Sequence, residues 1–171
     1  MIPKIFKIIA SVIVFFLSVY QLSENYVGNG IFCLFLSLFF ILIYFKNELI
    51  FLAFLRLRKQ DFEGTKKWLN KITNPEIQLV KKQQGYFHYL HGIILSQSNL
   101  NQAEKHFKLA IKFGLSMSAD LAMSKMSLAG ILMQKRRKRE AIELLNQAKK
   151  LDKHGMLNEQ IRILQNQLKR I

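Results

Sequence analysis

The chain has 171 residues, half of them hydrophobic, and a formal net charge of +15 at pH 7. Its single cysteine, Cys33, excludes an internal disulfide, and no cysteine and histidine cluster has the spacing of a metal site, so we expect no metal and no other cofactor. Of the 26 lysines and arginines, 24 lie after residue 45 with 10 of the 11 acidic residues, so this part favours anionic partners.

The first predicted element is a pair of apolar helices. Residues 5–22 are interrupted only by Lys7, two serines and Gln21, and the stretch 27–45 ends in 15 residues without a charge. A helix of 18 residues is about 27 Å long, which approaches the hydrocarbon thickness of a bilayer. The turn between the two stretches contains Gly28 and Gly30. The sequence therefore predicts that residues 1–45 form a transmembrane helical hairpin.

Positive charges flank the two apolar stretches and are missing from the turn between them. They are Lys4 and Lys7 on one side, and Lys46, Arg56, Arg58 and Lys59 on the other. The positive-inside rule then predicts an integral inner (cytoplasmic) membrane protein with both termini and the rest of the chain in the cytoplasm. Two alternatives stay open, namely a cleaved signal peptide for the first stretch and buried core helices for both.

After residue 45 a pattern returns every 38 residues. A small residue is followed four positions later by a large apolar residue, and three positions after that by a medium or small one. The three copies are Thr65–Leu69–Ile72, Ala103–Phe107–Ala110 and Ala141–Leu145–Ala148. These offsets lie on one face of a helix, and a fixed period of this length is typical of stacked helical hairpins.

The array is expected to span residues 46–154, with hairpins at 46–75, 77–114 and 118–152. The second helices are predicted at 62–72, 100–113 and 137–151, and the first helices of the second and third hairpins at 77–97 and 118–134. Residues 45–59 contain no glycine or proline, so we expect the second apolar helix to continue into the array without a break. Residues 155–171 carry Leu157, Ile161, Leu164 and Leu168 on one face and are predicted to be a capping helix.

The three triplets, with Leu90 and Leu128, resemble the tetratricopeptide repeat (TPR) family, as a membrane-anchored bacterial-type member. His91 departs from the pattern, because the family prefers a small residue there. The resemblance implies an all-α fold of about three hairpins, with a concave groove along the first helix of each hairpin. The groove residues that it implies are Ile50, Phe54, Leu57, His88, Gly92, Leu95, Met123, Met126, Gly130 and Met133. Alternatively, these side chains are core, and the capping helix fills the groove.

Two further features of the sequence carry hypotheses. The run Lys135, Arg136, Arg137, Lys138 and Arg139 falls at the turn of the third hairpin and is a candidate contact for anionic lipid or RNA, or else a solvated turn. His88 and His91 lie one helical turn apart, but no acidic residue or cysteine extends the pair along its helix, so we interpret it as structural.

The sequence shows no catalytic constellation or phosphate-binding loop, so we expect a protein that is not an enzyme and has no small-molecule substrate. The leading hypothesis is a membrane-anchored TPR-like adaptor or scaffold that holds a protein partner of a membrane-associated complex, in export, insertion or envelope assembly. One alternative is a basic tether that binds RNA, the ribosome or anionic membrane lipid. The other is a structural accessory subunit of a larger membrane complex.

Overall fold

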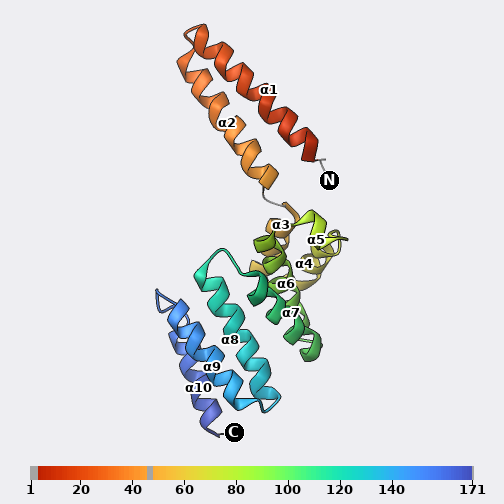
Figure 1. Cartoon of the computed structure of the whole chain (residues 1–171), viewed down its shortest axis with the longest axis vertical. Coiled ribbons are helices and arrows are strands. Elements are labelled where there is room, and N and C mark those ends of the chain that lie inside the picture. The colour runs from red at the N-terminus through yellow and green to blue at the C-terminus, as the bar shows by residue number, and fades with distance from the viewer. Residues whose placement is uncertain (1–3, 46–47, 171) are drawn as a thin grey trace. The chain divides into compact units, whose positions relative to one another are not determined.

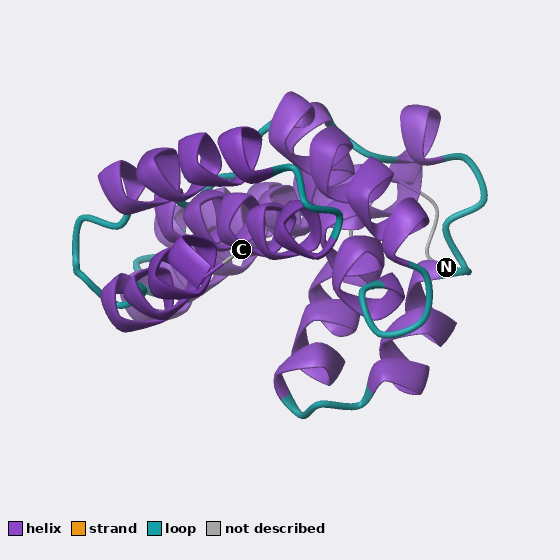
Figure 2. Cartoon of the chain, turned by 90° about the horizontal axis from the view of Figure 1, so that it is seen from below, coloured by secondary structure: helices purple, strands orange, loops and turns teal. Residues whose placement is uncertain are grey.

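The computed structural model describes residues 4–45 and 48–170, and within these ranges the regular structure is helical without a strand (Figure 2). The all-α prediction is confirmed. The helices are α1 (Lys4–Ser23), α2 (Val27–Phe45), α3 (Glu48–Arg58), α4 (Phe62–Leu69), α5 (Pro75–Gln78), α6 (Lys81–Leu95), α7 (Leu100–Phe113), α8 (Ser118–Gln134), α9 (Lys138–Leu151) and α10 (Asn158–Arg170). They form two compact units, Met1–Glu48 and Leu49–Ile171, which are described separately.

The first unit is a hairpin of α1 and α2 with three serines buried between the helices. Ser11, Ser18 and Ser37 are at most 5% exposed, because they lie in the seam between the helices. The Ser18 hydroxyl donates to the Gly30 carbonyl at 2.7 Å, and the Ser37 hydroxyl donates to the Ser11 carbonyl at 3.0 Å. Small side chains of this kind let two helices approach closely. Most large apolar side chains of the hairpin point outward instead, and Phe16 is 67% exposed.

The predicted integral inner-membrane localisation is contradicted. Within the described residues, none of the helices is both long enough and apolar enough to cross a bilayer. Crossing takes about 20 consecutive, predominantly apolar residues. In α1 the run is broken by Ser11, Ser18 and Gln21, and α2 opens with a Gly28–Asn29–Gly30 segment. The prediction of a transmembrane hairpin is therefore unsupported. The prediction that both termini lie in the cytoplasm depended on that hairpin and is withdrawn with it. We also predicted that the second apolar helix continues into the array without a break. That prediction concerns residues 46–47, which lie outside the described residues.

The second unit begins with α3, α4 and α5, and one apolar cluster joins residues of α3, α4 and the middle of α6 with Ile72 and Leu79 of the connecting segments. Asp61 caps α4, because its carboxylate accepts the Gly64 N–H at 2.8 Å. The cluster consists of Leu49, Ile50, Ala53, Leu69, Ile72, Leu79, Phe87 and Leu90. Sequence reasoning expected one helix to reach residue 72 and the next to begin at 77. In the structure α4 ends at Leu69, and extended backbone at Leu79 and Val80 separates the short α5 from α6.

The remaining helices form antiparallel pairs around a second apolar cluster (Figure 1). α6 packs against α7 and α8 packs against α9, while α7 contacts α8 and α10 lies mainly against α9. The repeat positions of the last two triplets are at most 1% exposed: Ala103, Phe107, Ala110, Ala141, Leu145 and Ala148. The small members let the paired helices approach, and the large members fill the space between them. The Asp152 carboxylate holds the chain before α10 by accepting the N–H groups of Met156 and Leu157.

Glycine fixes the closest approach between α6 and the end of α7. Gly114 ends α7 with φ +78°, a conformation that L side chains rarely adopt. A Cβ at Gly85 would clash with the Gly114 carbonyl oxygen, which is rigid backbone. Only a residue without a side chain therefore allows α6 to lie this close to the loop that leads into α8.

Candidate partner-binding surface

Four of the predicted groove residues lie along one face of α8, at offsets of 3, 7 and 10 from Met123. Met123 is 40% exposed, Met126 is half-buried, and a Cβ added to Gly130 would meet no atom within 4 Å. Met133, the last residue of this row, is buried at 6% exposure and is not accessible to a partner. We call Met123, Met126 and Gly130 the α8 face. It is apolar and open at the N-terminal side of the helix, and it is buried near the C-terminal end.

In the second hairpin, the predicted groove residues of α6 are directed at α7. Gly92 is buried, and a Cβ there would lie 3.0 Å from the ring of Phe107. The Nδ1 atom of His88 lies 3.1 Å from Nδ1 of His106 on α7, while Leu95 packs against the second cluster. Gly92, next to His91 in the sequence, lets α6 approach α7 closely.

In the first hairpin, the predicted groove residues belong to the apolar cluster. Ile50 is 8% exposed, and Phe54 and Leu57 are partly buried against its other members. α3 instead exposes Phe51 at 62% and Leu55 at 39%, one turn apart on another face. The ten predicted residues therefore do not form one open surface. The apolar pair at positions 51 and 55 was a readable signal that the sequence analysis missed.

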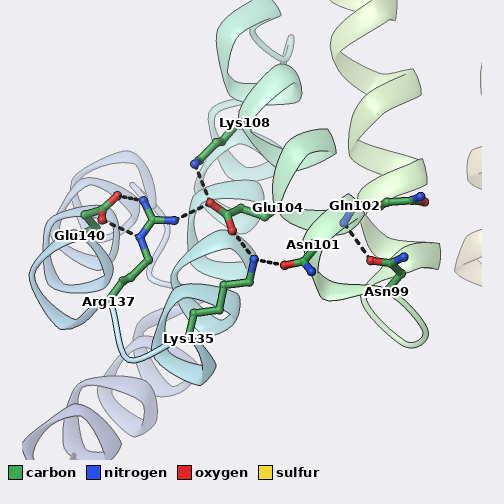
Figure 3. Close-up of polar contacts among 8 residues, drawn as sticks. All are labelled: Asn99, Asn101, Gln102, Glu104, Lys108, Lys135, Arg137 and Glu140. Atoms are coloured by element: carbon green, nitrogen blue, oxygen red, sulfur yellow. Dashed lines mark hydrogen bonds and ion pairs between the residues drawn. The ribbon is translucent and has the colours of Figure 1, made fainter.

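Glu104 of α7 organises the basic run between α8 and α9 (Figure 3). It is 7% exposed, and its carboxylate accepts from Lys108 at 2.6 Å, Lys135 at 2.6 Å and Arg137 at 2.7 Å. Arg137 also forms two bonds to Glu140, at 2.6 and 2.7 Å. Burial alone would raise the pKa of Glu104, but the hydrogen bonds from the three cations and the charge of Lys108 lower it to about 2.

Two of the five cations of the run are thus committed to an intramolecular carboxylate. Lys135 also donates to Asn101, at 2.6 Å. Arg136, Lys138 and Arg139 are the exposed members of the run, and Arg136 adopts a left-handed conformation with φ +60° at the turn. Glu104 lies 31 residues before Lys135, and nothing in the spacing pointed to this contact. The α7–α8 packing that brings them together could be seen only in the fold.

Three histidines, His88, His91 and His106, lie together at the contact between α6 and α7, and we call them the histidine cluster. The rings of His91 and His106 stack with centroids 5.1 Å apart, and His88 stacks on Phe113 at 5.6 Å. Burial, followed by the charge of the neighbouring imidazoles, lowers the pKa of His88 and of His91 to about 4, and burial also lowers the pKa of His106. Among the described residues, no group of three or more His, Cys, Asp or Glu side chains is arranged to hold a metal ion.

Comparisons of the chain with protein-family models, curated proteins and solved structures found no match. The TPR resemblance therefore depends on the residues of this chain alone.

Proposed function

We propose that the protein is a non-enzymatic adaptor, in which a TPR-like helical array holds a protein partner of a membrane-associated complex. The α8 face is the observation that carries this proposal. Methionine side chains are flexible and polarisable, so the exposed Met123 and the half-buried Met126 can adapt to an apolar partner surface. The vacant space beside Gly130 lets a partner's backbone or a bulky side chain approach the helix axis.

The rest of the array supports a binding role by being rigid. The residues that hold α8 against its neighbours, such as Leu128, Ala129 and Leu132, are at most 3% exposed. Tyr86 of α6 donates to the Asp120 carboxylate near the start of α8 at 2.6 Å. A partner that binds the α8 face therefore meets a surface that is already ordered, which reduces the entropy cost of association.

The outward apolar side chains of α1 and α2 support a second attachment. Large exposed apolar patches mark interaction sites, and the hairpin buries Ser11, Ser18 and Ser37 while large apolar side chains such as Phe16, Phe32 and Phe35 are exposed. In the proposed function the hairpin associates with an apolar surface of the same complex. The accessory-subunit hypothesis differs only in assigning the whole function to this hairpin.

The exposed cations Lys138 and Arg139 favour a second candidate function, a tether for RNA, the ribosome or anionic lipid. In that case, binding would weaken steeply with salt, and replacing both side chains with glutamine would reduce it. Binding through the α8 face would depend little on salt, because the face is uncharged.

The proposal is tested by photo-crosslinking from position 126 of the full chain in cells, with and without RNase treatment before mass spectrometry. The adaptor function predicts one dominant protein adduct that survives RNase. Position 142 on α9 is the control, because Ile142 is apolar and 41% exposed but lies on another helix. The same adducts from both positions, or loss of the adduct on RNase treatment, would count against the α8 face.

A further inference from the structure

The histidine cluster brings three imidazoles from two helices into mutual contact. His88 and His91 come from α6, and His106 comes from α7. His106 is the shared member, since it lies within hydrogen-bonding distance of His88 and stacks on His91. Phe87 packs edge-on against His91 with centroids 4.5 Å apart, and Phe113 stacks on His88. The aromatic rings limit the access of water to the cluster.

The contact between His88 and His106 restricts how many protons the pair can hold. Two ring nitrogens 3.1 Å apart form a hydrogen bond only when one carries a proton and the other offers a lone pair. One added proton, on a far ring nitrogen, leaves this bond intact. A second added proton would set two N–H groups against each other and two positive charges side by side, with His91 stacked on one of them. The doubly charged pair is therefore incompatible with the closed contact.

In the part of the chain that the structure describes, the contacts of the three histidines are with aromatic rings and with one another, and none is with a carboxylate. Burial lowers the pKa of all three rings, and the neighbouring imidazoles lower the pKa of His88 and His91 further. On α7, Glu104 is bonded to Lys108, Lys135 and Arg137, and on α8, Asp120 accepts from Tyr86. Asp61, before α4, pairs with Arg56. The other charged side chains of α4, α5, α6 and α7 are exposed: Glu63, Lys66, Lys67, Glu76, Lys81, Lys82, Lys105 and Lys112.

We propose that His88, His91 and His106 form a proton-sensitive latch, which holds α6 against α7 near neutral pH and releases it in mildly acidic solution. The inference concerns the packing of two helices and does not depend on the proposed partner. Histidine with a lowered pKa in the fold binds fewer protons than in an open state. The latch is therefore fully effective above about pH 6.5 and weakens as the pH falls toward 4.

The expected size follows from the ordinary histidine pKa of 6.5 and the value of about 4 in the fold. At pH 5 these two pKa values favour opening by roughly 30-fold for one ring taken alone, relative to neutral pH. Because the rings are only half-buried and influence one another, we expect about a tenfold increase for the whole cluster. Glu104 does not contribute in this range, because its pKa is about 2.

The test is hydrogen exchange with mass spectrometry on the full chain in a mild detergent, at pH 7.5 and pH 5.0, corrected for the intrinsic exchange rate. Peptides from α6 and α7 should open about tenfold more at pH 5.0, while peptides from α9 change little. His106→Phe keeps a ring but removes the shared imidazole, and it should abolish most of this response. His154→Phe is the matched control, because His154 is exposed beyond α9, and it should leave the response unchanged.

Equal pH responses in α6, α7 and α9 would overturn the latch, as would a full response in His106→Phe. If that variant fails to fold, NMR titration of the wild-type imidazoles gives the answer. The latch predicts that the amides of α6 and α7 shift together with the ring signals of the cluster. Ring titration without any change in those amides would overturn it.

Discussion

Replacing Glu104 with glutamine tests whether the buried carboxylate, and not the basic run itself, holds the turn between α8 and α9 to α7. Glutamine has the same shape but no charge, so Lys135 and Arg137 would keep their positions without their counter-ion. The side chains of Glu104, Lys135 and Arg137 are 9%, 27% and 39% exposed. The carboxylate is therefore desolvated, while its partners retain much of their hydration.

The magnitude follows from the pKa of Glu104, which the structure lowers from 4.5 to about 2. Since one pKa unit corresponds to about 1.4 kcal/mol, this shift is equivalent to about 3 kcal/mol. Solvent screening at the half-exposed cations reduces the expected loss in the free energy of unfolding to about 2 kcal/mol for Glu104→Gln. The lowered pKa also means that this contribution is complete above about pH 4.5 and is lost as the pH falls toward 2.

The assay is urea denaturation of the full chain at pH 7.5, followed by far-ultraviolet circular dichroism. A loss of about 2 kcal/mol should lower the midpoint by about 1 M urea. Glu140→Gln is the matched control, because Glu140 contacts the same Arg137 but its side chain is 52% exposed. That variant should cost less than about 0.5 kcal/mol. Equal midpoints for the two variants would refute the reasoning.

Further predictions concern close packing in both units. Gly85→Ala should destabilise the array by about 1–3 kcal/mol in the same assay, because its Cβ would meet rigid backbone, whereas Gly130→Ala should be neutral or stabilising by up to about 1 kcal/mol. If both substitutions changed the free energy of unfolding equally, the close approach of α6 to the end of α7 would be contradicted. With Cys33 replaced by serine, Ser11→Cys and Ser37→Cys together should form a disulfide under mild oxidation, since the two hydroxyl oxygens are 3.3 Å apart. Mass spectrometry after alkylation would detect it, and two free thiols would contradict the serine seam.

The helices of the array could be predicted from the sequence where capping signals and apolar period agree. α7 has the expected bounds, because Asn99 caps its first turn by accepting the Gln102 N–H and Gly114 ends it. α8 also matches, ending at Gln134. The prediction failed around Pro75, where a single expected helix is two, because extended backbone at Val80 interrupts it.

The candidate surface could be predicted only in part. Helical spacing identifies which residues share a face, but not whether the next helix covers that face. Met123 and Met133 have the same residue type and lie on the same row, yet one is exposed and the other buried. The apolar content of residues 5–45 was visible, but the prediction of two membrane crossings gave too little weight to the polar interruptions by serine, glutamine and the glycine-rich start of α2. The contacts of Glu104 with Lys135 and Arg137 could not be predicted for a different reason, since these two residues lie 31 and 33 positions further along the chain.

The most direct test of the account measures the adduct formed from position 126 in two variants. The side chains that they replace are almost equally exposed in the wild-type protein. Met123→Asp places a charge on the α8 face, and Ile142→Asp places one at a side chain that is 41% exposed, against 40% for Met123. Circular dichroism would confirm that both variants keep their helices. The account predicts that Met123→Asp removes the RNase-resistant adduct at least tenfold, equivalent to about 1.4 kcal/mol of binding, while Ile142→Asp leaves it intact. An adduct that survives Met123→Asp, or is lost equally in both variants, would contradict the assignment of partner binding to the α8 face.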